Sequence, residues 1–488
     1  MEVYPLSETI LIAGAGIAGL HAAMALSDGA RRITVLDRDP PPPDLGPDEA
    51  FESWERKGVT QLRHSHVFLG RLVTLIRAKH PALWTALLQN GAREHTFAEF
   101  LGPPLRNRYR YEPGDEEMSF LFSRRTTLEL TIRRYVATLP GVTFITDAGI
   151  RGVLRDGVRV TGLKVEIAGA MREMTADSVI DATGRTTQFP DWLGLENTIA
   201  ETSPAGILYF TRHYKLRDGA DEPPRDGPSG AGDLGYVKFG VFIADNRHFS
   251  ITLAVPEIET ELRTAMLNPE VFDAVCRQIP GTARWIEPER AEPASKVFGM
   301  GNLLSSWRTY LDGDTPRVLN LYPVGDAAQR TNPLYGRGCS IGAIQAHFLP
   351  EIFAETSDPA ARLRRLRERS QAELKPFYDV MVKQDEQAIR RAANERVPGY
   401  KPRLKSRIMK SFVEDAIGAA SRADLTVARA AMRAFHMLEH PTDWTKRGPI
   451  LARILKTWAT PKALKRGLYP PKAGPERAEM MKALGIAA

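Results

Sequence analysis

The chain has 488 residues, of which 43% are hydrophobic, 26% charged and 8% aromatic. At roughly 100–200 residues per domain this length fits two to four domains, and the composition excludes a disordered chain, a collagen-like repeat and a disulfide scaffold. The net charge of +7 is uneven, because residues 361–488 hold 28 Lys and Arg against 13 Asp and Glu, whereas the remainder holds 38 against 46. A basic tail on an acidic body indicates an anionic partner, such as a membrane or nucleic acid, or a basic layer docked on that body.

The sequence has no stretch near the ~18 consecutive apolar residues of a bilayer-spanning helix. Residues 1–9 carry Glu2 and Glu8 and lack the basic segment of a secretory signal. The two cysteines, Cys276 and Cys339, are far apart. This usage suits a reducing cytoplasm and excludes a zinc or iron–sulfur site built from cysteines. We therefore expect a cytoplasmic protein.

The first elements predict a strand, a tight turn, a helix and a second strand over residues 10–37. The turn reads Gly14-x-Gly16-x-x-Gly19. In such a turn the first glycine permits the bend, the second lets a pyrophosphate approach the backbone, and the third lets helix and strand pack closely. Asp37 ends the second strand, where a carboxylate can accept hydrogen bonds from ribose hydroxyls. The pattern predicts a dinucleotide site that either FAD or NAD would satisfy.

The remaining elements follow in chain order. Helical spacing covers residues 69–88 and 123–139, and strands are expected at 142–146, 158–167 and 178–182. Short strands with turns between 206 and 255 indicate an antiparallel sheet, and 218–233 reads as a loop. A strand at 318–324 precedes a helix at 338–348, and helical periodicity continues beyond 357. The predicted fold class is α/β, with a Rossmann-like domain, an inserted, mostly antiparallel β-sheet and a C-terminal helical region.

A second stretch, residues 320–340, distinguishes the two cofactors. Asp326 follows a strand and can accept from a flavin's ribityl chain, while Gly336 and Gly338 allow a flat ring to approach the backbone. A helix that starts near Ser340 would aim its positive end at the N1–C2=O edge of the ring. These features favour a flavin over a nicotinamide.

The chain resembles the p-hydroxybenzoate-hydroxylase-type FAD superfamily, and within it the FAD-dependent monooxygenases and epoxidases that act on lipophilic substrates. The stretches that carry the resemblance are the first fingerprint through Asp37-Arg38, residues 58–66, Ser123-Arg124 with Leu128-Glu129 and Arg133, residues 179–185 and residues 325–338. The resemblance implies that Arg38, Arg124, Asp181 and Gly325 belong to the FAD site together with the residues above. Thr60 and Cys339 depart from the family, whose members usually have Pro and Met there.

The resemblance also implies the organisation of the chain. Residues 1–80, 121–200 and 311–355 would form the FAD-binding domain, and residues 81–120 and 201–310 the substrate domain. Residues 356–488 would form the basic helical region.

The chemistry implied is largely that of the cofactor. A flavin C4a-hydroperoxide would transfer one oxygen of O2 to a lipophilic unsaturated or aromatic substrate, by epoxidation or hydroxylation. Electrons would come from NAD(P)H or from a partner flavin reductase. The alternatives are a reductase of prenyl-type double bonds, a redox-neutral cyclase or isomerase, and a non-enzymatic flavin- or lipid-binding module. Halogenation is disfavoured, because Arg284-Trp285-Ile286-Glu287-Pro288 is not the Trp-x-Trp-x-Ile-Pro signature of flavin-dependent halogenases.

Four residues are candidates for the substrate pocket. His64 and His66 share one side of an extended segment; they either line the flavin pocket or hydrogen-bond to the adjoining loop. Two histidines without a third ligand do not make a metal site, so we expect no metal. Tyr335 and Arg337 either border the substrate or stiffen their loop.

In the tail, Leu451, Ile454, Leu455 and Trp458 recur at helical spacing among basic residues. Such a helix either lies on an anionic membrane or packs on the body with its basic face in water, and packing is the favoured interpretation. No recognition fold accompanies the charge, so we expect no nucleic-acid partner.

Overall fold

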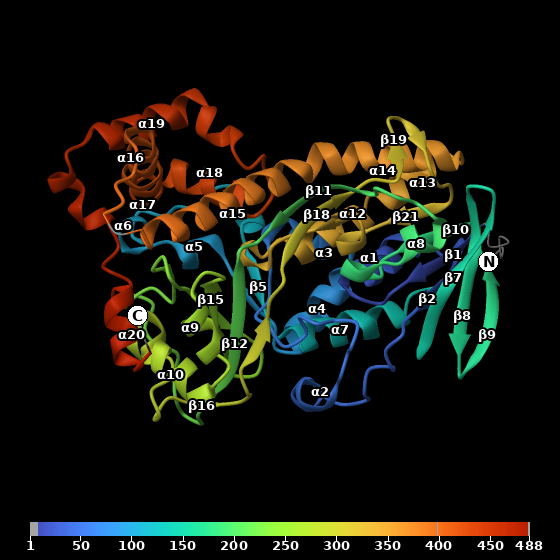
Figure 1. Cartoon of the computed structure of the whole chain (residues 1–488), viewed down its shortest axis with the longest axis horizontal. Helices are drawn as coiled ribbons and strands as arrows, with labels where there is room; N and C mark the ends of the chain where they lie inside the picture. The colour runs from blue at the N-terminus through green and yellow to red at the C-terminus, as the bar shows by residue number, and fades with distance from the viewer. Residues whose placement is uncertain (1–7, 398, 487–488) are drawn as a thin grey trace.

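The computed structural model describes residues 8–397 and 399–486, and its centre is a five-stranded parallel sheet (Figure 1). The strand order is β21-β10-β1-β2-β6. The bounds are β1 Glu8–Ala13, β2 Arg31–Leu36, β6 Val142–Ile145, β10 Ser178–Asp181 and β21 Leu321–Pro323. Strands from both ends of the first 330 residues therefore belong to one sheet, with β10 between β1 and β21, and the carboxyl ends of these three strands meet at one edge of the sheet.

The helices against this sheet enclose the largest apolar core. Helix α1 (Ile17–Leu26) contacts α7 (Arg125–Ala137), α12 (Gly338–Ala346) and α13 (Leu349–Glu355). The helical stretch predicted over 69–88 is two helices, α3 (Gly70–Lys79) and α4 (Pro81–Gln89). Proline lacks the N–H that would continue the first helix, so the chain breaks at Pro81.

Three three-stranded sheets and a two-stranded one, β19 (Leu311–Asp312) with β20 (Thr315–Pro316), accompany the parallel sheet. An antiparallel sheet of β7 (Ala148–Asp156), β8 (Arg159–Ile167) and β9 (Ala170–Thr175) lies at the right edge of Figure 1. The other two contain β3 (Val67–Phe68), β5 (Phe120–Phe122) and β4 (Arg93–His95), and β11 (Ile199–Pro204), β18 (Leu304–Arg308) and β22 (Gln329–Arg330). Short helices in these connections are α2 Pro47–Ser53, α5 Phe97–Phe100, α6 Pro103–Arg106 and α8 Phe189–Leu193.

The inserted sheet is antiparallel and has its own core, as the sequence predicted. Its longest strand, β12 (Ile207–Leu216), pairs with β15 (His248–Pro256), β16 (Ala291–Pro293) and β17 (Phe298–Met300). On the other side of β15 come β14 (Lys238–Ile243) and β13 (Ala231–Asp233). Helices α9 (Thr260–Ala265), α10 (Pro269–Gln278) and α11 (Pro280–Ala283) accompany it, and Trp285 is buried in its core.

The C-terminal region is helical, which confirms the predicted fold class. Helices α14 (Pro359–Glu373) and α15 (Lys375–Glu395) run across the top of Figure 1 to a cluster at the upper left. The cluster contains α16 (Leu404–Ser411), a π-helical turn (Phe412–Gly418), α17 (Ala419–Ala423), α18 (Leu425–Phe435) and α19 (Gly448–Ala459). The last helix, α20 (Arg477–Ala483), returns to the inserted sheet and buries Met480 and Met481 there. Among the described residues, no helix is both long and apolar enough to cross a bilayer.

Candidate functional site

One continuous cavity of about 1270 Å³ lies between the parallel sheet and the inserted sheet. Its first part is lined by residues 14–18, Asp37, Arg38 and residues 147–151. Its middle is lined by residues 182–186 and 324–326, and its far part by side chains of β12, β14 and β15. The two fingerprint stretches, which are about 300 residues apart in the sequence, therefore meet in a single space.

The glycine turn leaves room where a cofactor phosphate would need it. Gly14 has φ +103°, and a Cβ there would lie 2.5 Å from the carbonyl oxygen of Ala182. A Cβ on Gly19 would lie 1.9 Å from the carbonyl oxygen of Gly14, so this position packs helix against strand. Gly16 is different, because it lines the cavity and nothing lies within 4 Å of its Cβ position. The N-terminus of α1 follows directly and opens onto this space.

The end of β2 forms a buried charge cluster around Arg56, a residue that the sequence did not single out. Arg56 donates from Nη2 to Asp37 Oδ2 at 2.7 Å and from Nη1 to Glu129 Oε2 at 2.6 Å. It also contacts Asp39 and donates to the carbonyl oxygen of Ala15 in the glycine turn. Burial raises the pKa of the Asp37 carboxyl, and the Arg56 guanidinium opposes that rise. The cluster fixes Asp37 at the cavity wall beside Arg38.

The second fingerprint forms the opposite wall. Asp326 lines the cavity and makes no hydrogen bond or ion pair with any residue in the described ranges. Burial raises the pKa of its carboxyl, while Arg330, Arg125 and Arg185 lower it from a distance. Its side chain is half-buried because it faces the cavity, and a ribityl hydroxyl there would supply a hydrogen-bond donor that the described part of the chain does not.

Small residues bring the two helix N-termini together at this wall. Gly325 has φ +62°, and a Cβ there would lie 2.7 Å from the Cβ of Ala18 in α1. Gly342 of α12 would meet the same Ala18 Cβ at 3.2 Å. Gly336 and Gly338, which precede and begin α12, also line the cavity. The donor set and the open cradle at Gly16 fit an FAD molecule.

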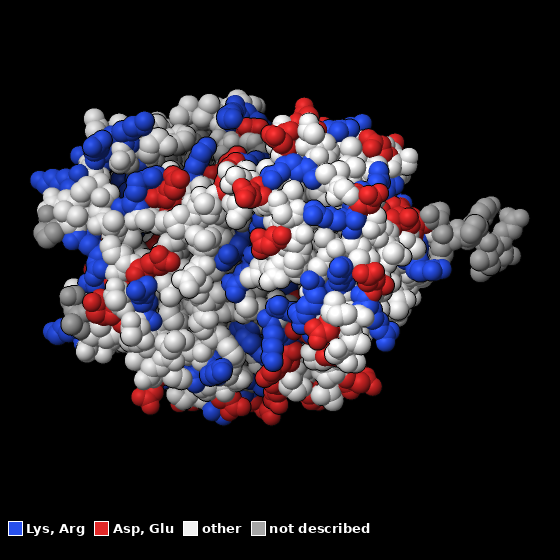
Figure 2. Space-filling model, turned by 45° about the vertical axis from the view of Figure 1, so that its right-hand side comes forward, with Lys and Arg blue, Asp and Glu red and all other residues white. Residues whose placement is uncertain are grey.

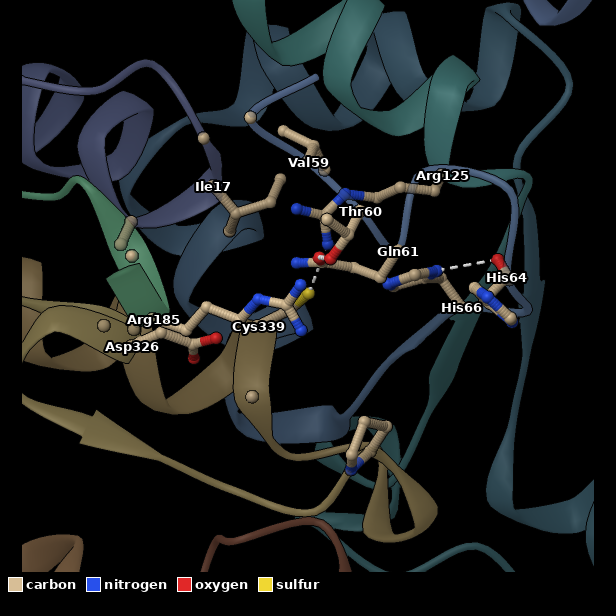
Figure 3. A pocket seen from close by; sticks show the side chains of 18 of the residues that line it. Ile17, Val59, Thr60, Gln61, His64, His66, Arg125, Arg185, Asp326 and Cys339 are labelled. Atoms are coloured by element: carbon tan, nitrogen blue, oxygen red, sulfur yellow. Dashed lines mark hydrogen bonds between the residues drawn. The ribbon is translucent and has the colours of Figure 1, made fainter. Parts of the chain in front are cut away.

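Arg124 lies outside the cavity lining, and its contact with FAD stays a prediction. This side chain is buried outside the cavity lining, where its Nε donates to Asp245 Oδ2 at 3.0 Å and its Nη2 contacts Asp48. Arg125 lines the cavity instead and donates to Cys339 Sγ at 2.7 Å (Figure 3). It also donates to Glu129 Oε1 at 2.6 Å. Arg124 is the extended N-cap of α7 and Arg125 its first helical residue, so the two side chains leave the backbone in different directions.

Asp181 also lies outside the cavity lining. Its carboxylate accepts from the backbone N–H and the hydroxyl of Thr183 at 3.0 and 2.6 Å, and from the Thr187 hydroxyl at 2.6 Å. These bonds hold the turn whose residues 182–186 line the cavity. Asp181 thus shapes the wall, and a direct contact with a nucleotide stays a prediction.

His64 and His66 both line the cavity (Figure 3). The Nδ1–H of His66 donates to the carbonyl oxygen of His64 at 2.9 Å, which leaves its Nε2 as an acceptor. Nδ1 of His64 lies 2.9 Å from Thr211 Oγ1. Burial lowers the pKa of His64 to about 4 and that of His66 well below its usual value, so both rings are neutral at pH 7.

A chain of hydroxyl groups continues from His64. Thr211 Oγ1 lies 2.8 Å from Thr252 Oγ1, and Ser65 Oγ lies 2.7 Å from both Thr252 Oγ1 and Ser250 Oγ. The chain connects the loop that carries the histidines to two strands of the inserted sheet. Hydroxyl groups can each donate and accept, so this chain can pass a proton or orient one without a charged intermediate.

Tyr335 and Arg337 have different roles. Tyr335 lines the cavity, and its hydroxyl donates to Asp385 Oδ1 of α15 at 2.9 Å. Burial raises the pKa of Asp385 to about 6, and Asn332 donates to the same oxygen. Arg337 is buried outside the lining and donates to the carbonyl oxygen of Phe377 at 3.3 Å. Arg337 therefore stiffens the loop, whereas Tyr335 borders the cavity.

The far part of the cavity is mainly apolar, with Tyr209, Thr211, Lys238 and Thr252 as its polar lining residues. Five phenylalanines from four segments are among its lining residues, and two of them, Phe100 and Phe435, are nearly half exposed. The apolar lining residues are Phe100, Phe120, Phe122, Val241, Phe242, Met300, Leu303, Leu334 and Phe435. Thr60 and Cys339, the two departures from the family pattern, line the middle part (Figure 3). The described residues contain no group of three or more His, Cys, Asp or Glu side chains that could hold a metal ion.

Solved structures of flavin-dependent proteins share this fold. The myxobacterial chondrochloren halogenase CndH, a FAD-dependent halogenase, aligns with a TM-score of 0.58 at 16% identity over 95% of this chain and 98% of that chain. PqsL of Pseudomonas aeruginosa, described as "a probable FAD-dependent monooxygenase", gives 0.55 at 16% identity over 79% and 97%. The Diels-Alderase PyrE3 of pyrroindomycin biosynthesis gives 0.58 at 15% identity over 89% and 81%.

The chain therefore has the fold of FAD-dependent monooxygenases and halogenases of the p-hydroxybenzoate-hydroxylase type, as the sequence predicted. Its sequence is similar to that of protein Rv3254 of Mycobacterium tuberculosis, a distant homologue. The two are 28% identical in an alignment of 394 positions that covers 73% of this chain and 76% of Rv3254. No protein-family model matches the chain.

Proposed function

We propose that the protein is an FAD-dependent monooxygenase that transfers one oxygen atom of O2 to a lipophilic unsaturated or aromatic substrate. The observation that carries this proposal is the continuity of the cavity, which joins a wall suited to a dinucleotide to an apolar chamber. A protein that only binds flavin would not need the apolar chamber. An enzyme that uses a nicotinamide cofactor would not need the cavity wall that contains Asp326.

The residues that would hold FAD follow from the cavity lining. Asp37 and Arg38 would receive the adenosine ribose, and Gly16 with the N-terminus of α1 the pyrophosphate. Asp326 would accept from the ribityl chain, and Gly336, Gly338 and Cys339 would border the ring. When bound, the flavin supplies the redox chemistry, taking up electrons and activating O2.

The chain's own groups position the substrate and exclude water. The phenylalanines at the far end of the cavity favour an apolar molecule and keep water away from the reacting atoms. The Tyr335 hydroxyl donates to Asp385, so its oxygen remains free to accept a hydrogen bond from a substrate hydroxyl. The Nε2 acceptor of His66 and the hydroxyl chain from His64 to Ser250 can hold a proton near the reacting atoms.

The source of electrons is part of the proposal. Either NAD(P)H reduces the flavin in this protein, or a partner flavin reductase delivers reduced flavin. Stopped-flow reduction of the FAD-loaded protein by NADPH and NADH, with and without substrate, separates the two routes.

A second candidate is a redox-neutral cyclase or isomerase that uses the same cavity as a template. The similarity in fold to the Diels-Alderase PyrE3 supports this second candidate function. In that case the apolar chamber would fold a polyunsaturated substrate, and the flavin would stay oxidised throughout.

The deciding experiment follows product and flavin together. The FAD-loaded protein is reduced anaerobically, mixed with isotopically labelled O2 and a panel of lipophilic aromatic and polyene compounds, and the products are analysed by mass spectrometry. We expect one labelled oxygen per flavin oxidised. Bromide in the buffer tests halogenation, and product formed without O2 from oxidised enzyme would favour the second candidate. A protein that does not bind FAD would refute both.

A further inference from the structure

Helix α16 is the most exposed helix of the C-terminal cluster. Residues 401–410 are all exposed, and α16 buries none of its eight side chains. Leu404 is 69% exposed, Ile408 47% and Met409 51%. A helix this short is unstable alone in water and takes its stability from packing an apolar face. The exposed apolar side chains of α16 therefore indicate a contact with a partner outside this chain.

The side chains of α16 divide into two faces. Leu404 and Ile408 are four residues apart and lie on one side. Met409 lies further round the helix, and Lys405 stands between Ile408 and Met409, from where its long side chain can reach the water side. Arg403, Arg407 and Lys410 recur at i, i+4 and i+7 and lie on the other side. The helix is amphipathic, with arginine and lysine as its polar face.

The charge around this helix has one sign. Residues 396–411 contain six Lys and Arg and no Asp or Glu. Within the described part of the chain, Lys401, Arg403, Lys405 and Arg407 form no ion pair. In Figure 2, Lys and Arg side chains stand out at the upper left, the end of the molecule that carries this helical cluster in Figure 1.

We propose that α16 docks the protein on an anionic lipid membrane, lying in the headgroup region with Leu404, Ile408 and Met409 toward the acyl chains. Acyl chains accept the apolar side chains and lipid phosphates accept the cations, as in other interfacial amphipathic helices. A second copy of the chain is disfavoured as occupant, because it would bring six like charges against six. A single convex helix also offers no groove for a folded protein, whereas a membrane requires no complementary shape.

The rest of the cluster supports α16 and is itself packed. The helix expected from the sequence to meet a membrane, α19, uses its apolar side internally, because Ile450 and Ile454 are buried against neighbouring helices. Trp458 of α19 donates to Ser411 Oγ at 3.1 Å and so holds the end of α16. This arrangement assigns the membrane contact to residues 399–413 and not to residues 445–486.

Docking by α16 would also bring a source of lipophilic molecules near the cavity. Helix α18 of the same cluster contributes Phe435 to the apolar end of the cavity. This consequence rests on the proposed function, but the docking itself does not, since binding to vesicles requires neither flavin nor turnover.

The test is flotation of the full-length protein with vesicles of phosphatidylcholine alone or mixed with phosphatidylserine, at low and high salt. We expect binding to the mixed vesicles only, weakened by salt. The double variant L404Q/I408Q and the triple variant R403Q/R407Q/K410Q should each lower the partition coefficient at least about tenfold. The matched controls are L455Q, which removes an exposed leucine of α19, and K164Q/R172Q in the β7–β9 sheet; both should bind as the unmodified protein does.

A fluorescence measurement locates the contact. In I408W, the new tryptophan should shift to shorter wavelength on mixed vesicles and be quenched by brominated lipids. Absence of binding to either vesicle, or equal binding by the variants and the unmodified protein, would overturn the proposal. A dimer that forms without lipid and dissociates in L404Q/I408Q would assign the helix to a second copy instead.

Discussion

Gly16 gives a direct test of the cofactor site at the scale of one residue. A Cβ there meets no protein atom within 4 Å, so Gly16→Val should fold normally and fill only the space beside the α1 N-terminus. We expect the affinity for FAD to fall at least about tenfold, which corresponds to about 1.4 kcal/mol, with little change in Tm. The measurement is fluorescence titration of the apoprotein with FAD, alongside thermal denaturation. Gly448→Ala, an equally open position at the start of α19, is the control and should leave both values unchanged.

Asp326 should show opposite effects on stability and on binding. Its carboxylate has no partner in the described chain, and burial raises its pKa, so Asp326→Asn removes a charge that the apoprotein stabilises poorly. We expect the apoprotein to become more stable by about 1 kcal/mol while its affinity for FAD falls. Asp181→Asn is the contrasting variant, because Asp181 accepts three hydrogen bonds and its replacement should destabilise the fold. A loss of stability in Asp326→Asn would show that this carboxylate has a partner we have missed.

At the scale of elements, Arg56 links β2, the glycine turn and α7. Replacing it with Met would remove the one cation that contacts Asp37, Asp39 and Glu129 together, although Arg125 still pairs with Glu129 and Arg133 with Asp37. Removing one member of a buried charge cluster typically destabilises a protein by about 3–5 kcal/mol. Urea denaturation of Arg56→Met should show a loss of that order. Arg151→Met, which breaks the exposed pair with Glu166, is the control and should cost less than about 1 kcal/mol.

The elements also show where prediction from sequence stops. The βαβ opening and the Asp326 wall were predictable, because their glycines and carboxylates are required by local backbone geometry and follow strands directly. Which of Arg124 and Arg125 lines the cavity was not predictable from the sequence. It depends on which of the two side chains contacts Asp245, which is over 100 residues away in the sequence. Arg56 and Asp385 were missed for the same reason: each acts through partners from distant elements, and neither belongs to a local motif.

At the scale of the whole molecule, the histidines predict acid lability. Nine of the ten have lowered pKa values, chiefly because they are buried; the values are about 3 for His21 and His213, and about 4 for His64, His248 and His436. These rings stay neutral in the fold, whereas in the unfolded chain they take up protons near pH 6.5. The unfolded state then binds more protons, so stability falls as the pH drops below about 6.5 and continues to fall toward pH 4.

Urea denaturation at pH 7.5 and pH 5 measures this effect. We expect a loss of several kcal/mol, since each unit of pKa shift corresponds to about 1.4 kcal/mol. His347→Gln removes one of the buried rings and should reduce the slope of stability against pH, whatever it does to stability at pH 7.5. His440→Gln, at an exposed position, is the control. Equal stability at the two pH values would contradict the prediction.

The continuity of the cavity has a consequence for how ligands should be sought. Because no partition of protein atoms separates its two halves, a bound flavin would itself be one wall of the chamber that the substrate enters. In the apoprotein the substrate pocket then lacks one of its walls, and the shape that selects a substrate is complete only after FAD binds. Compound libraries screened against the apoprotein would select molecules that compete with FAD for its site. Substrate selectivity therefore has to be measured on the FAD-bound protein.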